Sequence, residues 1–343
     1  ASLEAVGYQD LDEKVPMRTD TLFRIASMTK PITAIGIMIL VDEKKLSVDD
    51  PVEKYLPEFR GMKLKTAGGQ QPAGLGTPSR PIKLRDLLTH TSGMHGGLPR
   101  AMAGLYLTRD HTLAEAVALY AKEPLEFEPG TKWSYCNVGI DTLGRILEVA
   151  SGQSYESFLK QRVFDPLGMP DTCFYPTPEQ RKRLAATYNK KEGKLVRVTS
   201  DIIGLPPDAK YPIPAGGLCS TAGDLARVYR MMLGHGQLDG KRILSPGSVQ
   251  EMTQVHTGNL TSGFTPGLGF GFGWGVVREP QGVTAMLSPG TFGHGGAFGT
   301  QGWIDPKKDL ILVMLIQRVG LPNGDASAMR REFQSVAVSA LAK

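Results

Sequence analysis

The sequence predicts an α+β fold, in which an antiparallel sheet packs against helices near the two ends of the chain and a mostly helical part is inserted between them. Two observations carry this prediction. Apolar residues recur with a helical period over 27–45 and again over about 325–342. Strand-like segments follow one another at 270–278, 300–305 and 310–317 instead of alternating with helices. Strands and helices that are segregated in this way favour an antiparallel sheet.

The first predicted helix has apolar residues at positions 32, 35, 39 and 40, and its Pro31 is tolerated in a first helical turn. Four further helices are expected, at 112–122, 137–151, 154–164 and 222–234. The 343 residues are long enough for one large domain. We expect a single catalytic domain, with an α/β part over about 1–60 and 215–343 and a mostly helical part over about 61–214.

Composition excludes several classes of function. The formal net charge is +5 and the charged residues are scattered, so no basic stretch predicts nucleic-acid binding. The longest apolar stretch, 32–41, is too short to span a membrane. The three cysteines, at 136, 173 and 219, show neither a disulfide framework nor a zinc pattern, and no residue pattern predicts a metal ion or an organic cofactor.

A serine and a lysine three residues apart mark the start of the first predicted helix. Ser27 and Lys30 would lie on one helical face, within hydrogen-bonding reach of each other. A serine hydroxyl becomes a good nucleophile when a neighbouring base takes its proton, and a desolvated lysine can be that base. Ser27 is therefore the leading candidate for a catalytic nucleophile.

The same spacing occurs a second time, at Ser157 and Lys160. This copy lies within an amphipathic pattern that has apolar residues at 155, 158, 159 and 163, so its serine and lysine belong to a polar helical face. We expect no catalytic role for it.

Two other motifs combine polar groups with turn residues. Tyr135 and Asn137 follow a Pro-Gly turn and, as alternate residues of an extended segment, point the same way. A tyrosine near a lysine can pass a proton between nucleophile and leaving group. The segment from His294 through Gly295 and Gly296 would let a ligand lie against a strand edge, where backbone N–H groups can stabilise an oxyanion.

Taken in order, the three motifs resemble those of the serine β-lactamase and penicillin-recognising family, in particular its class C-like branch with the family VIII carboxylesterases and D-alanyl-D-alanine peptidases. The resemblance covers nearly the whole chain and implies a β-lactamase/transpeptidase-like fold. Supporting segments are 87–94, 137–140 and 214–225.

The resemblance also implies roles for individual residues. Ser27 would be the acylated nucleophile, and Lys30 and Tyr135 its acid/base partners. Asn137, His294, Gly295 and Gly296 would contact the substrate. The oxyanion hole would consist of the backbone N–H groups of Ser27 and Ala297.

The third motif differs from the Lys-Thr-Gly of the family because Gly295 has no hydroxyl. In the β-lactamases and peptidases that hydroxyl helps to bind the substrate carboxylate, so its absence favours ester hydrolysis. A protonated His294 would partly compensate, and β-lactam turnover would then rise as the pH falls through the imidazole range. Three alternatives stay open: a β-lactamase, a D-amino-acid-specific peptidase, and a non-catalytic penicillin-binding or sensor domain.

The expected partner is a small-molecule ester or amide substrate, and the sequence leaves the oligomeric state open. Members of the family normally have a helix and one more strand before the point where this sequence begins. The resemblance therefore implies a preceding N-terminal segment. Location in the periplasm, outside the cell or in the cytoplasm also stays open.

Overall fold

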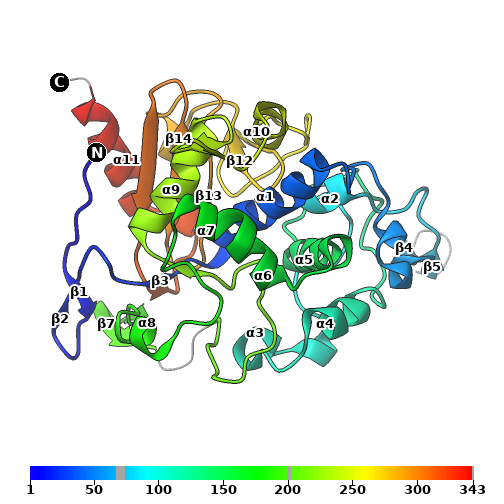
Figure 1. Ribbon diagram of the computed structural model, residues 1–343, viewed down its shortest axis with the longest axis horizontal. Helices are drawn as coiled ribbons and strands as arrows, with labels where there is room; N and C mark the ends of the chain where they lie inside the picture. The colour runs from blue at the N-terminus through cyan, green and yellow to red at the C-terminus, as the bar shows by residue number, and fades with distance from the viewer. Residues whose placement is uncertain (67–73, 199–201, 342–343) are drawn as a thin grey trace.

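The computed structural model describes residues 1–66, 74–198 and 202–341 (Figure 1). Helix α1 (Thr29–Asp42) lies between a C-terminal sheet and a mostly helical region. Residues 29–40 of this helix are all buried, which explains the apolar stretch found in the sequence. The helix packs against α5 (Asn137–Ser151) and α6 (Tyr155–Leu159). The first predicted helix is thus confirmed, although it runs over 29–42 and a 3-10 helix, Ala26–Met28, precedes it.

The C-terminal sheet has five strands, and each pairs antiparallel with its neighbour in the sequence. The strands are β11 (Leu268–Phe270), β12 (Gly275–Val277), β13 (Phe292–Gly295), β14 (Gln301–Asp305) and β15 (Leu310–Met314). The antiparallel sheet is as expected, but the single strand expected at 270–278 is two short strands joined by a turn. Strand β13 places His294 opposite Gly302 and Gly295 opposite Gln301.

Helices α9 (Ala222–Leu233) and α11 (Ala328–Ala340) cover opposite faces of this sheet. Gly302 packs against the Tyr229 ring of α9, whereas the neighbouring Trp303 lies under the guanidinium of Arg330 in α11. Neighbouring residues of a strand point to opposite faces, so the two helices are separated by the sheet.

The closing helix begins at residue 328, slightly later than the expected 325. A separate 3-10 helix, Gly324–Ala326, comes first. Ser327 then caps α11, because its hydroxyl accepts a hydrogen bond from the Arg330 amide (3.3 Å).

The other elements are short. The expected helix at 154–164 is α6 continued by a π-helical turn at Lys160–Phe164, and the one at 112–122 is α4 (Leu113–Tyr120). The remaining α-helices are α2 (Leu84–Leu88), α3 (Leu105–Thr108), α7 (Asp165–Leu167), α8 (Pro178–Lys182) and α10 (Pro246–Thr253). The remaining 3-10 helices lie at Val52–Lys54, Pro57–Phe59, Arg100–Met102 and Gly282–Thr284.

Small sheets pair further segments, and two of them join strands that are distant in sequence. The pairs are β1 (Tyr8–Asp10) with β2 (Val15–Pro16), β3 (Phe23–Arg24) with β8 (Cys219–Ser220), β4 (Leu64–Thr66) with β5 (Gly74–Gly76), and β9 (Gln237–Leu238) with β10 (Lys241–Arg242). A three-stranded sheet joins β6 (Tyr188–Lys191) to β7 (Lys194–Arg197) and β16 (Arg318–Val319). The pairs that are distant in sequence are β3 with β8 and β6 with β16.

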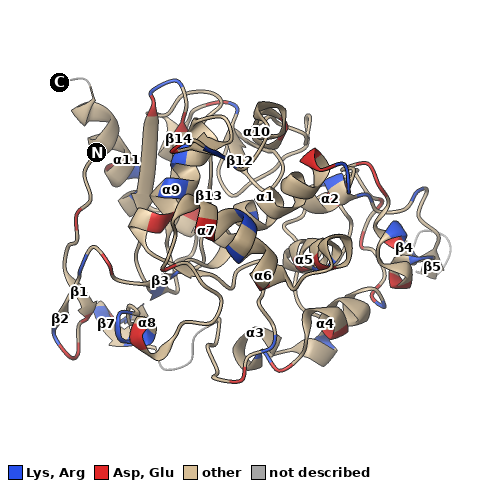
Figure 2. Ribbon diagram, viewed as in Figure 1, with Lys and Arg blue, Asp and Glu red and all other residues tan. Residues whose placement is uncertain are grey.

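Charged residues of both signs are spread over the elements of the molecule (Figure 2). Within the described ranges, no helix combines the length and the apolar character needed to cross a membrane.

Candidate active site

The segment that carries Ser27 is held from two sides. Strand β3, which immediately precedes this segment, pairs with β8. The Gln317 side chain accepts a hydrogen bond from the Arg24 amide (3.2 Å) and donates one to the Arg24 carbonyl (2.9 Å). The chain then turns at Ala26, which has a φ of 45°. A left-handed conformation is unfavourable for a residue with a Cβ, so surrounding contacts must hold this turn.

Lys30 contacts Ser27 directly. Its Nζ lies 2.9 Å from the Ser27 Oγ and donates a 2.6 Å hydrogen bond to the carbonyl of Ala215. The lysine is fully buried, and this burial lowers its pKa from 10.5 to about 7. A substantial fraction of the amine is therefore neutral near pH 7, as a general base requires.

A buried carboxylate, which the sequence did not predict as part of the site, lies behind Lys30. Asp141 of α5 accepts hydrogen bonds from the Ala215 amide (2.8 Å) and the Tyr106 hydroxyl (2.8 Å). Burial raises the pKa of Asp141 to about 6, and the charge of Lys30 opposes that rise. In the other direction, the charge of Asp141 raises the pKa of Lys30 and so limits the effect of burial.

Tyr135 completes the contacts of the Ser27 hydroxyl. Its phenol lies close enough to the Ser27 side chain for the two to interact, and the Lys30 Nζ lies 4.7 Å from its ring centroid. Burial raises the pKa of the phenol well above its usual value, so Tyr135 keeps its proton and can donate it. Three groups of the first two motifs thus meet at one point.

His90, which no sequence motif marked as functional, positions the Tyr135 segment. Its carbonyl accepts from the Ser134 amide (2.9 Å), and its Nδ1 accepts from the Cys136 amide (3.1 Å). Its ring also lies 4.5 Å from the Tyr135 ring, centroid to centroid. The two backbone bonds flank Tyr135 and fix the direction of the phenol.

Asn137 is the first residue of α5 and is partly exposed. The intervening Cys136 is buried and caps the helix, because its thiol accepts from the Gly139 amide (3.3 Å). Tyr135 and Asn137, on either side of it, are both partly exposed, and the prediction that they face the substrate together stays a prediction.

His294 lies in β13 and is 5% exposed. Its ring Nδ1 donates to the carbonyl of Gly295 (2.6 Å). Burial and the nearby charge of Lys30 lower the pKa of His294 to about 4. The imidazole is therefore neutral throughout its usual titration range, and the expected compensation by a protonated His294 does not occur there.

Gly296 and Ala297 form the turn that follows β13. A Cβ at Gly296 would overlap the Thr300 hydroxyl and the carbonyl of Ile25, so the glycine lets this turn approach the nucleophile segment. The Thr300 hydroxyl also bonds the Ile25 carbonyl (3.2 Å). Ala297 is exposed, and Ser27 is the second residue of a 3-10 helix, where early amides have no partner within the helix.

Aromatic rings form one wall beside Tyr135. The Phe264 ring lies 4.9 Å from the Tyr135 ring and 5.8 Å from that of Trp133, and Phe264 is 42% exposed. The Phe270 ring lies 5.3 Å from the Trp133 ring. This wall offers an apolar surface to a substrate.

The second serine–lysine spacing forms no such site. Ser157 is exposed and bonds Ser154 (2.9 Å), while Lys160 pairs with Asp165 (2.6 Å). Its expected location on a polar face is confirmed. In the part of the chain that the structure describes, no group of three or more metal-ligating side chains is placed to hold a metal ion.

Comparisons with known proteins agree with this fold. The family model described as Beta-lactamase matches residues 2–336. A Mycobacterium tuberculosis protein is 39% identical over 94% of this chain and 84% of its own length. Esterase EstB of Burkholderia gladioli is 31% identical over 91% of this chain and 81% of its own length.

A solved structure has a similar fold. EstCE1, described as a hydrolase with promiscuous acyltransferase activity, superposes with a TM-score of 0.81 at 27% identity, covering 98% of this chain and 89% of its own. The fold, the extent of the family match and these similarities agree, and the chain belongs to the beta-lactamase family of serine hydrolases.

Proposed function

We propose that this protein is a carboxylesterase that works through an acyl-enzyme on Ser27. The observation that carries the proposal is the 2.9 Å contact between the Ser27 hydroxyl and a lysine amine whose pKa is lowered to about 7. We further propose that the chain acts as one catalytic domain, with this site between the C-terminal sheet and the mostly helical part.

Acylation begins with neutral Lys30. One of its N–H groups donates to the Ala215 carbonyl, which leaves the lone pair free for the Ser27 proton. As the proton moves to Nζ, Oγ forms a bond to the ester carbonyl carbon. The backbone N–H groups of Ser27 and Ala297 stabilise the resulting oxyanion.

Collapse of the tetrahedral intermediate breaks the bond to the alcohol oxygen. Tyr135 gives its proton to that oxygen, and the Lys30 ammonium replaces it. Water then attacks the acyl-enzyme with the same groups acting in reverse, which releases the acid and restores the Ser27 hydroxyl. Asn137 and His294 contact the bound acyl group as neutral polar side chains.

Two features favour esters over β-lactams. Gly295 provides no hydroxyl for a substrate carboxylate, and an ester needs no such anchor. Esterase EstB and the hydrolase EstCE1, both similar along nearly the whole chain, support the same choice.

A panel of three substrates tests the proposal: a short-chain p-nitrophenyl ester, nitrocefin and a D-alanine p-nitroanilide. We expect the largest kcat/KM for the ester, its loss in Ser27→Ala, and no loss in Ser157→Ala, the matched control in the second motif. A preference for nitrocefin or the anilide would replace the esterase with a β-lactamase or a peptidase. Stable acylation without turnover would indicate a sensor.

A further inference from the structure

The space next to Gly295 is filled by a carboxylate from another part of the chain. A Cβ at position 295 would overlap the Asp325 Oδ1 and the amide nitrogen of the Gln301 side chain. Asp325 belongs to the 3-10 helix that precedes α11, about 30 residues after β13 in the sequence. An acidic group therefore stands where the side chain of residue 295 would otherwise begin.

Asp325 is held in place through its side chain and its backbone. Its Oδ1 accepts a 2.9 Å hydrogen bond from the Gln301 amide. Its own amide donates to the Asn323 side chain (3.0 Å), and its carbonyl accepts from the Arg330 guanidinium (2.7 Å). These bonds fix the position of the carboxylate beside β13.

The positive charge of Arg330 lies behind Asp325 and is enclosed by protein. Its nearest nitrogen is 4.0 Å from the Asp325 Oδ1, and its guanidinium lies 4.0 Å above the Trp303 ring. Arg330 is completely buried, whereas the Asp325 side chain is 19% exposed. Solvent therefore reaches the carboxylate and not the guanidinium.

The Asp325 charge also acts on the candidate active site. Burial is the main cause of the pKa shifts of Tyr135 and His294; the Asp325 charge adds to the rise at Tyr135 and opposes the fall at His294, which places the carboxylate within electrostatic range of the two rings. A charged group of the substrate that lies over Gly295 would be closer still.

We propose that Asp325 is a specificity-determining residue that disfavours esters carrying a carboxylate near the scissile bond and favours neutral or amine-bearing esters. This inference rests on the proposed esterase function. The carboxylate acts in two ways: it occupies the volume beside Gly295, and it repels an anion that approaches β13.

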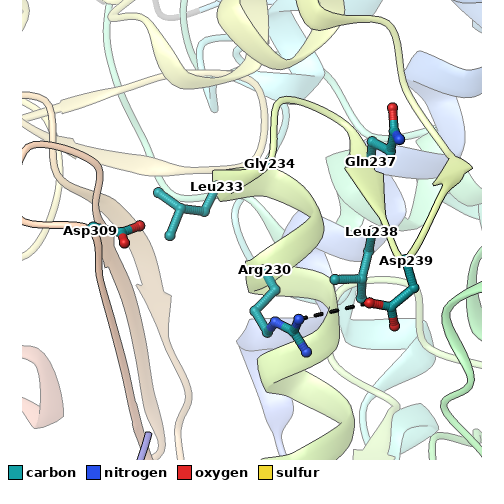
Figure 3. Close-up of a pocket in the computed structure, with 7 residues that line it drawn as sticks. All are labelled: Arg230, Leu233, Gly234, Gln237, Leu238, Asp239 and Asp309. Atoms are coloured by element: carbon teal, nitrogen blue, oxygen red, sulfur yellow. Dashed lines mark ion pairs between the residues drawn. The ribbon is translucent and has the colours of Figure 1, made fainter.

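Two p-nitrophenyl esters of matched shape test the inference: the monoester of glutaric acid, which is anionic, and the corresponding methyl glutarate diester, which is neutral. The test variant is Asp325→Asn, which removes the charge and retains an oxygen that can accept from Gln301. The control is Asp239→Asn, which removes the same charge elsewhere. Asp239 lines a groove between α9 and the β9–β10 hairpin and pairs with Arg230 (3.8 Å); the groove shares no residue with the candidate active site (Figure 3).

For wild type and Asp239→Asn we expect kcat/KM to be about tenfold higher for the neutral ester than for the anionic one. This ratio corresponds to a repulsion of about 1.4 kcal/mol between the Asp325 carboxylate and the anionic substrate. This preference should weaken as salt is raised to about 0.5 M, because ions screen a partly exposed charge. In Asp325→Asn the kcat/KM values of the two esters should differ by no more than about twofold, chiefly because KM for the anionic ester falls.

If Asp325 had a purely structural role, its substitution would change kcat/KM for both esters by the same factor, and the ratio of the two values would remain that of wild type. That result, or equal turnover of the two esters by wild type, would overturn the inference while the esterase function stands. Absence of any Ser27-dependent ester hydrolysis would instead contradict the proposed function itself. If Asp325→Asn does not fold, the salt dependence of the wild-type ratio decides, and a salt-independent ratio counts against the inference.

Discussion

Lys30 and Asp141 bond the same residue, Ala215, through its two backbone groups. The Lys30 amine donates to the carbonyl (2.6 Å), and the Asp141 carboxylate accepts from the amide (2.8 Å). The lysine is thereby fixed toward Ser27, while a buried negative charge tunes its proton affinity. Asp141 is best described as a positioning residue, because it reaches the serine only through Lys30.

Replacing Asp141 by Asn should shift the pH dependence of ester hydrolysis toward acid. Lys30 acts as a base when neutral, so kcat/KM rises with pH through its pKa of about 7. Asp141 raises that pKa, and its removal should move the rising limb down by on the order of one pH unit. The measurement is kcat/KM between pH 5 and 9.

The matched control for this experiment is Glu148→Gln, in the same helix. Glu148 pairs with Arg145 (2.9 Å), and its substitution should leave the pH at which kcat/KM rises unchanged. A shift of the Asp141→Asn profile toward alkaline pH would contradict the assigned role.

Lys30 and Tyr135 should behave as one proton-transfer unit. Both contact the Ser27 hydroxyl, so Lys30→Ala and Tyr135→Phe should each lower kcat by on the order of 10³. The double variant should be little worse than either single variant. Losses that add in free energy would show that the two side chains act in separate steps.

His294 should not respond to pH under assay conditions. Its pKa of about 4 keeps the ring neutral above pH 5, so nitrocefin turnover, if detectable, should not rise as the pH falls from 7.5 to 5.5. It should instead decline with the ester activity, because both depend on neutral Lys30. A rise that disappears in His294→Gln would restore the protonated histidine expected from the sequence.

Restoring the hydroxyl of the family motif should require two substitutions. In Gly295→Thr alone the new side chain meets the Asp325 carboxylate, and we expect little gain in β-lactam hydrolysis. Gly295→Thr with Asp325→Ala removes the carboxylate and leaves only the end of the flexible Gln301 side chain to move aside. This double variant should raise kcat/KM for nitrocefin by about tenfold, the contribution of one hydrogen bond to a charged group. Asp325→Ala alone serves as the control. If Gly295→Thr alone raised kcat/KM for nitrocefin as much as the double variant does, Asp325 would not block the space beside residue 295.

The sequence predicted those parts of the fold and site that follow from local pattern. The serine–lysine spacing at a helix start placed Ser27 and Lys30 together, and the sheet and its helices followed from periodicity. Asp141 also left a local signal, because it is the only acidic residue between positions 129 and 147, in a segment read as a helix.

Other features depend on tertiary contacts that no local pattern records. Asp325 lies beside Gly295 only because α11 is docked on the sheet, and its position in a polar turn looks ordinary in the sequence. The neutral state of His294 likewise follows from burial near Lys30. A histidine in a glycine-rich segment gave no indication of that environment.

The residue to which an acyl group becomes attached identifies the nucleophile most directly. The protein is mixed rapidly with a p-nitrophenyl ester, quenched in acid during the initial burst, digested and mapped by mass spectrometry. We predict a single acylated site at Ser27, one equivalent of burst p-nitrophenol, and loss of both in Ser27→Ala but not in Ser157→Ala. Acylation at another residue, or a full burst from Ser27→Ala, would contradict the assignment of Ser27 as the nucleophile.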